Sequence, residues 1–157
     1  MEHTEPKKRV LIVDDDIAIS SHLKYFLELK GCEVETAATG REAIEKSARG
    51  VFDVALLDIK LPDMEGTELL AKIHKIKPGM MKIMITGFAS LENAVKSVNH
   101  GADAYIMKPV NPDQLLSAIE EKLKQQEEAE RLDEDRVSDW LESRLLKLER
   151  AYASEAE

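Results

Sequence analysis

The stretch that decides the fold is VFDVALLDIKLPDMEG, residues 51–66. Its apolar run at residues 54–57 ends on a carboxylate, Asp58, and the turn residues Pro62 and Gly66 follow. A short apolar run between turn signals predicts a buried strand. Ligands of open parallel sheets bind at the carboxyl ends of the strands, so we expect Asp58 to face a crevice. This stretch alone leaves three roles open for Asp58: nucleophile, metal ligand or ordinary loop residue.

The composition narrows the classes of function. The chain has 157 residues, enough for one domain and an appendage. Its formal net charge of -9 argues against nonspecific nucleic-acid binding, which needs a basic surface. The single cysteine, Cys32, excludes an internal disulfide and fits a reducing compartment. No apolar run approaches the roughly 20 residues of a membrane span, and the first ten residues lack the apolar core of a signal peptide. We therefore expect a cytoplasmic protein that binds neither nucleic acid nor membrane.

Strand and helix patterns alternate along the chain. Apolar runs predict five strands, at residues 10–13, 32–37, 54–57, 81–86 and 104–107. Apolar residues at helical spacing predict helices at residues 17–30, 39–50, 67–77, 91–100 and from Pro112 onward. Such alternation requires a parallel sheet with helices on both faces. The expected fold class is therefore α/β, with a doubly wound five-stranded parallel sheet and a C-terminal helical extension.

Helix signals fix the expected ends and inner faces. Asp16 and Ser90 are expected N-caps, and Thr39 with Glu42 forms a capping-box pattern. The helical spacing of apolar residues also predicts that the following side chains face the core: Ile76, Ala94, Val95 and Val98.

Polar side chains stand at the carboxyl ends of four strands. Asp14 and Asp15 follow the first strand, Asp58 the third, Thr86 the fourth and Lys108 the fifth. These ends share one edge of a parallel sheet, and clustered carboxylates there need a cation such as Mg²⁺, which prefers hard oxygen ligands. Asp58 would then attack phosphorus as a carboxylate nucleophile, with Thr86 and Lys108 stabilising the phosphoryl oxygens.

Four motifs now carry a resemblance: VLIVDDD at residues 10–16, ALLDIKLPDMEG at 55–66, MITGFAS at 84–90 and AYIMKPV at 104–110. In this order and spacing they resemble the receiver domain of two-component response regulators. The resemblance covers about residues 9–123 and implies the flavodoxin-like (βα)5 receiver fold. It also implies a response regulator without a DNA-binding or enzymatic output domain, because the remaining tail is short and lacks such motifs.

The resemblance implies the role of each acidic residue. Asp58 matches the phosphoryl acceptor, and Asp15 matches a direct Mg²⁺ ligand. Asp14 would act on the metal through water, and the backbone carbonyl of Lys60 would complete the protein ligands. The Lys60 side chain and Phe88 are expected to flank the phosphoryl group and to restrict the attacking water.

The same resemblance implies a switch on the other strands. Thr86 matches the switch hydroxyl, Lys108 the family lysine, and Tyr105 the aromatic residue that turns inward when the threonine moves toward phosphate. Pro109 matches a proline whose preceding peptide bond is usually cis.

The implied function is a phosphorylation-dependent switch of protein–protein contacts. A sensor histidine kinase or phosphotransfer protein would phosphorylate Asp58, and an output protein that the sequence does not name would sense the change. The only catalysis expected is the protein's own phosphoryl transfer and dephosphorylation. Two alternatives stay open: a phosphorelay intermediate, and a receiver fragment of a larger transcription factor or sensor kinase. A metal-dependent phosphatase is disfavoured, because it would need an acid where Lys60 stands.

Three segments are expected: a flexible leader at residues 1–8, the receiver domain at 9–123, and a charged linker with an amphipathic helix at 124–157. The apolar stripe of that helix comprises Val137, Trp140, Leu141, Arg144, Leu145, Leu148 and Tyr152. A stripe of this size normally finds a partner. It would fold back on the receiver, pair with its copy or dock another protein, and a homodimer could instead use the last helix–strand–helix face.

Overall fold

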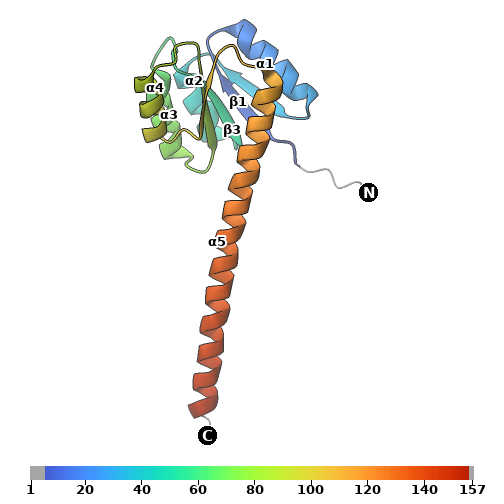
Figure 1. The fold of residues 1–157 in the computed structure, drawn as a ribbon, viewed down its shortest axis with the longest axis vertical. Helices are drawn as coiled ribbons and strands as arrows, with labels where there is room; N and C mark the ends of the chain where they lie inside the picture. The colour runs from blue at the N-terminus through green and yellow to red at the C-terminus, as the bar shows by residue number, and fades with distance from the viewer. Residues whose placement is uncertain (1–5, 156–157) are drawn as a thin grey trace. The chain divides into compact units, whose positions relative to one another are not determined.

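The computed structural model describes residues 6–155 and contains a five-stranded parallel sheet in the order β2-β1-β3-β4-β5 (Figure 1). The strands are β1 (Arg9–Val13), β2 (Glu33–Ala37), β3 (Val54–Asp58), β4 (Met81–Thr86) and β5 (Ala104–Met107). The helices are α1 (Ile17–Leu29), α2 (Gly40–Arg49), α3 (Gly66–Ile76), α4 (Leu91–Asn99) and α5 (Pro112–Glu155). Strands and helices alternate throughout, so the predicted doubly wound α/β fold is confirmed.

Helices cover both faces of the sheet, and this explains the apolar central strands. The helices α2, α3 and α4 lie together on one side, and α1 lies on the other (Figure 1). Every residue of β3 and β4 is buried, whereas the edge strands β2 and β5 are partly exposed. Strands that are covered on both faces need continuous apolar runs, and residues 54–57 supply one.

Local sequence signals set the helix starts as predicted. Asp16 accepts a hydrogen bond from the backbone N–H of Ile19, and Ser90 accepts one from Asn93. Thr39 accepts from the N–H of Glu42, whose carboxylate in turn accepts from Ala38. These bonds satisfy N–H groups that the first helical turn leaves without an intrahelical partner.

Gly66 fixes the position of α3 against the strand that carries Asp58. A Cβ atom at this position would collide with the backbone of Asp58 and Ile59. The N–H of Gly66 also donates to the carbonyl of Ile59. Glycine is therefore required here for close backbone approach, and it lets α3 begin directly behind Asp58.

The predicted inner face of α4 is wrong in part. Val95 and Val98 are 49% and 68% exposed, whereas Ser97 is fully buried. The Ser97 hydroxyl donates to the Asn93 carbonyl at 2.7 Å, so α4 can turn its small residues inward without an unsatisfied polar group. Ile76 is also wrongly predicted, since it is 41% exposed at the last position of α3.

The contacts divide the chain into two compact units, Met1–Ile119 and Glu120–Glu157. The second unit belongs to α5, which continues without a break through the expected charged linker. Most of the expected leader, residues 1–5, and the last two residues lie outside the described part of the chain. None of the helices within residues 6–155 combines the length and apolar character that a membrane crossing needs.

Candidate functional site

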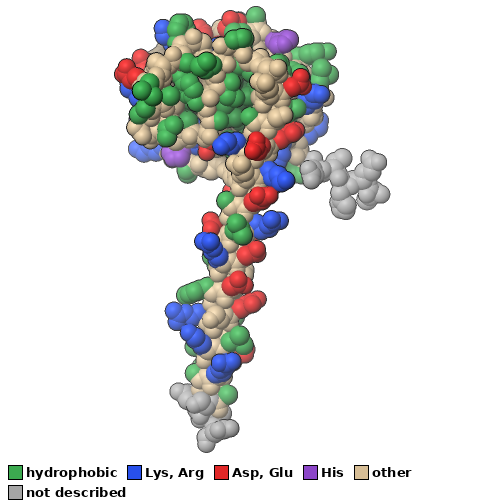
Figure 2. Space-filling model, viewed as in Figure 1, with side chains coloured by type: hydrophobic (Ala, Val, Ile, Leu, Met, Phe, Trp, Pro, Cys, Tyr) green, Lys and Arg blue, Asp and Glu red, His purple; other side chains and the backbone are tan. Residues whose placement is uncertain are grey.

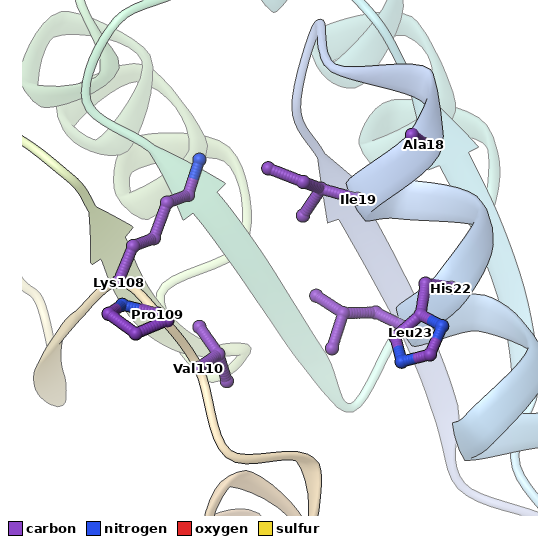
Figure 3. Close-up of a pocket in the computed structure, with 7 residues that line it drawn as sticks. All are labelled: Ala18, Ile19, His22, Leu23, Lys108, Pro109 and Val110. Atoms are coloured by element: carbon purple, nitrogen blue, oxygen red, sulfur yellow. The ribbon is translucent and has the colours of Figure 1, made fainter.

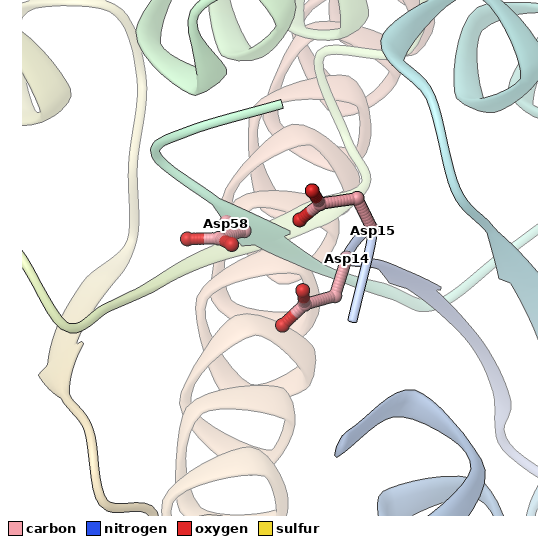
Figure 4. A group of neighbouring side chains, drawn as sticks. All are labelled: Asp14, Asp15 and Asp58. Carbon is pink, nitrogen blue, oxygen red and sulfur yellow. The ribbon is translucent and has the colours of Figure 1, made fainter. Parts of the chain in front are cut away.

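Three carboxylates meet at the carboxyl edge of the sheet. Asp14 and Asp15 follow β1, and Asp58 ends β3. The two strands are neighbours and pair in parallel, so their carboxyl ends lie side by side. One carboxylate oxygen from each of the three residues lies within 4.8 Å of the other two (Figure 4). Asp14 and Asp58 are buried and Asp15 is exposed, so the cluster opens toward solvent on one side. Hard oxygen donors at this spacing suit a divalent cation.

Lys108 supplies the positive charge of this cluster. Its Nζ lies 2.9 Å from Oδ2 of Asp14 and 3.4 Å from Oδ2 of Asp58. The backbone places it there, because the N–H of Lys108 donates to the carbonyl of Thr86 at 2.8 Å. The peptide bond between Lys108 and Pro109 is cis, as the resemblance implied. The structure therefore brings together four of the predicted site residues: Asp14, Asp15, Asp58 and Lys108.

The pKa values of Asp58 and Lys108 are both raised, but for different reasons. Burial, followed by the nearby charge of Asp14, raises the pKa of Asp58, although Lys108 and the backbone N–H of Lys60 act against the shift. Burial alone would lower the pKa of Lys108, but hydrogen bonding and attraction to Asp14 and Asp58 outweigh it and raise that pKa. The carboxylate of Asp58 is thus a destabilised base held beside a firmly protonated ammonium group.

Asp14 and Asp15 occupy different environments although they are adjacent in sequence. Oδ1 of Asp14 accepts from the N–H of Asp16 at 2.9 Å, and its Oδ2 accepts from Lys108. Asp15 is exposed at the mouth of the cluster. The exposed carboxylate of Asp15 can therefore exchange solvent for a cation, whereas that of Asp14 would first have to give up hydrogen bonds within the protein.

The loop after β4 is tied to the site by two contacts. Oγ1 of Thr86, a fully buried residue, accepts from the N–H of Phe88 at 2.9 Å. The Nζ of Lys60 lies 4.0 Å from the centroid of the Phe88 ring, which is within cation–π range. The sequence identified Lys60 and Phe88 as flanking residues, but only the fold shows that they contact each other.

Tyr105 is turned toward the interior. It is half-buried and packs against the core cluster formed by residues such as Leu57 and Met84. Its hydroxyl oxygen is buried and has no hydrogen-bond partner among the described residues. The structure does not bring Tyr105 into the carboxylate cluster, and no hydrogen bond joins it to Thr86 in the described part of the chain.

An apolar groove lies beside Lys108. It has a volume of about 710 Å³, and Figure 3 shows α1 on one wall and the segment after β5 on the other. Its lining comprises Ala18, Ile19, His22, Leu23, Lys108, Pro109 and Val110. The sequence did not reveal this groove, because helical spacing alone does not show which apolar side chains line an open groove.

Comparison with known proteins settles the family. The family model described as "Response regulator receiver domain" matches residues 10–120. The chain belongs to this family. The match extends from β1 to the start of α5 and includes the four sequence motifs, and the receiver is therefore a module of two-component signalling.

Among curated relatives, this chain is 36% identical over 149 residues to the alginate biosynthesis transcriptional regulatory protein AlgB of Pseudomonas aeruginosa. The match covers 91% of this chain and 33% of AlgB. The chain is 34% identical over 114 residues to the transcriptional regulatory protein ZraR of Escherichia coli, covering 73% of this chain and 26% of ZraR. The chain thus spans about a third or less of the length of these relatives.

Solved structures share the receiver fold. A CheY-like receiver domain protein from Methanospirillum hungatei is 62% identical with a TM-score of 0.77, covering 79% of this chain and 99% of that one. A response regulator from Burkholderia pseudomallei, solved with a phosphorylated aspartic acid, a calcium ion and citrate, is 29% identical with a TM-score of 0.71. That match covers 81% of this chain and 75% of the other.

The Asp58→Asn substitution should stabilise the metal-free protein at neutral pH. Because the pKa of Asp58 is raised from 3.8 on folding, the folded state holds the proton more tightly, and stability falls as pH rises from about 3.8 through the folded pKa. Asparagine keeps the shape and removes the charge. Urea unfolding in EDTA should therefore give a higher midpoint than wild type at pH 7, with the difference vanishing below about pH 3.8.

Asp16→Asn is the matched control. It neutralises an exposed acid at the same edge of the sheet, and asparagine caps a helix about as well as aspartate. A midpoint that rises as much in Asp16→Asn as in Asp58→Asn would contradict the assigned cause.

Proposed function

We propose that this protein is a phosphorylation-driven switch in which Asp58 accepts a phosphoryl group from a histidine kinase or phosphotransfer protein. The observation that carries the proposal is the Lys108 ammonium group bound to both Asp14 and Asp58 at a metal-suited carboxylate cluster. A structural role alone would not require three carboxylates in one partly buried place, because their mutual repulsion is unfavourable without a cation.

The geometry supports attack by Asp58 on a phosphohistidine. A carboxylate oxygen of Asp58 forms the bond to phosphorus while the nitrogen–phosphorus bond of the donor breaks, and the donor imidazole keeps the electron pair. Burial makes the Asp58 carboxylate more basic and therefore a better nucleophile. Lys108 stays protonated and would donate to a phosphoryl oxygen after transfer. In dephosphorylation, water attacks the phosphorus atom, the bond between phosphorus and the Asp58 oxygen breaks, and the products are inorganic phosphate and the free Asp58 carboxylate.

Mg²⁺ is the cofactor that fits this cluster best. Asp14, Asp15 and Asp58 would hold it together with the backbone carbonyl of Lys60, and when bound it neutralises charge on the phosphoryl oxygens. The exposed Asp15 and the hydrogen-bonded Asp14 support a division into a direct ligand and one that acts through water. The Burkholderia regulator was solved with a phosphorylated aspartic acid and a calcium ion, which supports the use of a divalent cation by such proteins.

Thr86 and Tyr105 are proposed to carry the change outward. The Thr86 oxygen now accepts from Phe88, and its proton is available to a phosphoryl oxygen, which gives the phosphorylated state a contact that the free state lacks. A displacement of Thr86 would alter the space beside the inward Tyr105 ring. The output face would include α4, whose Leu91, Val95 and Val98 are exposed.

The apolar groove supports a protein as the phosphodonor. A donor histidine must reach Asp58, and the groove shares Lys108 with the carboxylate cluster. An apolar surface next to a charged centre suits a partner that docks by hydrophobic contact and presents a polar group. We propose that the encounter takes place in the cytoplasm and involves no nucleic acid or membrane surface.

Two other functions stay open: the chain could be the receiver segment of a longer regulator, or it could be a phosphorelay intermediate. The former is favoured by the length of the relatives, which are transcriptional regulators of which this chain spans 26% to 33%. We propose residues 9–123 as the receiver and residues 124–157 as a charged linker and amphipathic helix, an arrangement supported by the family match to residues 10–120.

Phosphorylation itself provides the first test. With Mg²⁺ and acetyl phosphate, intact-mass spectrometry should show a single phosphoryl adduct that hydroxylamine removes, as expected for an acyl phosphate. The Asp58→Asn variant and EDTA should each abolish the adduct, whereas Asp16→Asn should retain it. An adduct of unchanged amount in Asp58→Asn would refute the proposal.

The Thr86→Ala variant separates phosphorylation from switching. Because Thr86 is not the nucleophile, the adduct should form to within about tenfold of the wild-type rate, the range of one lost hydrogen bond. Hydrogen exchange should lose most of the protection change that beryllofluoride and Mg²⁺ cause in α4 and β5. Thr86→Ser keeps the hydroxyl and should restore that change. If Thr86→Ala responds like wild type, the proposed route through Thr86 is wrong.

The Lys60–Phe88 contact should lengthen the life of the phosphoryl group. A cation–π contact at an exposed site contributes about 0.5–1 kcal/mol, so its loss should speed dephosphorylation about two- to fivefold by admitting water. We expect this in Lys60→Asn and Phe88→Ala, measured as decay of the adduct, while Lys60→Arg should stay near wild type. Equal decay rates in all four proteins would exclude a shielding role.

A further inference from the structure

Asp63 makes a contact that the proposed reaction does not use. It lies in the loop between β3 and α3, and its two carboxylate oxygens accept from the backbone N–H groups of Gly40 at 2.8 Å and Arg41 at 2.9 Å. Both N–H groups belong to the first turn of α2. Charged side chains of both signs are spread over the visible face of the receiver (Figure 2), so exposure and charge alone do not distinguish this acid. The two hydrogen bonds, which span 23 and 22 residues of sequence, do distinguish it.

The first turn of α2 is suited to hold a carboxylate. Its first N–H groups have no acceptor within the helix, and the helix dipole places partial positive charge there. The bonds from Gly40 and Arg41 lower the pKa of Asp63, so this side chain is charged at neutral pH. Hydrogen bonds to a charged acceptor are stronger than those between neutral groups. The contact is therefore a specific link between the loop and the helix.

A neighbouring contact fixes the same two segments. Met64 packs against the core cluster and fills the space beside Gly40, where a Cβ atom would collide with the Met64 thioether. Glycine at the first position of α2 thus lets the loop approach the helix closely. The base of the loop is closed, because Lys60 and Glu65 pair as an antiparallel bridge. A displacement at the tip of the loop would therefore be carried to Lys60.

The loop and α2 each continue to an acidic residue of the site. The backbone N–H of Lys60 bonds to the Asp58 carboxylate and acts to lower its pKa, against the effect of burial. On the other side, the N–H of Asp14 donates to the carbonyl of Ala37 at 3.1 Å, and α2 begins three residues later. Asp14 and Asp58 are thus also connected by a series of contacts that passes through α2 and Asp63.

We propose that Asp63 is a positioning residue for the cation site, which sets the Lys60 backbone at the carboxylate cluster by holding the β3–α3 loop to α2. The inference rests on the proposed function, because it takes the cation to bind at that cluster. Asp63 itself lies outside the cluster, which comprises Asp14, Asp15 and Asp58. Mg²⁺ tolerates little deviation from octahedral geometry, so a loosened loop should weaken its binding.

Asp63→Ala tests this role in the full-length, unphosphorylated protein. A Mg²⁺ titration followed by the NMR amide resonances of residues 58–60 should give a dissociation constant about three- to tenfold above that of wild type, less than the roughly 10- to 100-fold loss typical of direct partners of metal ligands. With acetyl phosphate, the Mg²⁺ concentration that gives half the maximal rate should rise by the same factor. The rate at saturating Mg²⁺ should stay within about twofold of wild type, because the transferring groups are unchanged.

Thr39→Ala and Glu65→Gln are the matched controls. Thr39→Ala removes the side-chain cap of the same helix, which is the bond from the N–H of Glu42, and leaves the loop intact. Glu65→Gln removes one charge from the same loop, and the Glu65 side chain makes no capping hydrogen bond. Both should bind Mg²⁺ within about twofold of wild type, since exposed charges interact weakly. Asp63→Asn keeps one acceptor oxygen and should weaken binding by less than Asp63→Ala.

Hydrogen exchange in EDTA tests the contact without a metal. In Asp63→Ala, the N–H groups of Gly40, Arg41 and Lys60 should exchange faster than in wild type, because the link between loop and helix is lost. Thr39→Ala should accelerate exchange at Glu42 and leave Lys60 unchanged. Unchanged exchange at Lys60 in Asp63→Ala would contradict the proposal, since the loop would then not depend on Asp63.

The binding results separate this inference from the proposed function. A wild-type protein that binds no Mg²⁺ refutes the proposed function and, with it, this role for Asp63. If wild type binds Mg²⁺ and Asp63→Ala binds it equally well, only the positioning role is wrong. An equal loss in Thr39→Ala would assign the effect to helix stability, and an equal loss in Glu65→Gln would assign it to charge; either excludes positioning.

Urea unfolding shows whether each variant is folded. If Asp63→Ala does not fold, the comparison of Asp63→Asn with Glu65→Gln decides the question, because each replaces a carboxylate of the same loop by an amide. Weaker Mg²⁺ binding in Asp63→Asn than in Glu65→Gln supports the positioning role, and equal binding excludes it.

Discussion

The structure depends on the pairing of the Lys108 ammonium group with the buried carboxylates of Asp14 and Asp58. In the strand order β2-β1-β3-β4-β5, Lys108 follows the edge strand and reaches past β4 to the two central strands. Buried carboxylates without a counter-charge would be strongly unfavourable, so the pairing allows the acidic cluster to exist in the folded protein. In the proposed function a phosphoryl group would compete with the two carboxylates for Lys108, because its oxygens are strong hydrogen-bond acceptors.

The central strands and α4 differ in how much of their apolar surface is buried. The strands β3 and β4 are buried over their full length, whereas α4 turns small residues such as Ser97 inward and leaves Val95 and Val98 exposed. An element with few buried apolar side chains has little packing to lose when it moves. Residues 87–90 connect α4 to Thr86, and Asn93 of α4 donates to the Phe88 carbonyl at 3.1 Å. A helix with few buried apolar side chains thus lies shortly after Thr86.

The sequence predicted the fold and the cluster for the same reason. Apolar runs that end on Asp14, Asp58 and Lys108 imply parallel strands, and parallel strands bring their carboxyl ends together. Periodicity failed for α4, because it assumes that apolar side chains face inward, while Ser97 satisfies its own hydroxyl and packs more closely. The Lys60–Phe88 contact and the groove beside α1 join segments distant in sequence, and side-chain directions in loops have no period from which they could be predicted.

Trp140 gives the molecule an optical property that follows from its position. It is the single tryptophan of the chain, and it precedes Leu141 in the helical unit. The Cζ atom of Arg144 lies 5.2 Å from the centroid of its ring. The receiver unit, with residues up to Ile119, contains no tryptophan. Intrinsic fluorescence excited at the indole band therefore samples the environment of the C-terminal helix, whereas tyrosine absorbance includes Tyr25 and Tyr105 of the receiver. The two halves of the protein can be followed separately in one unlabelled sample.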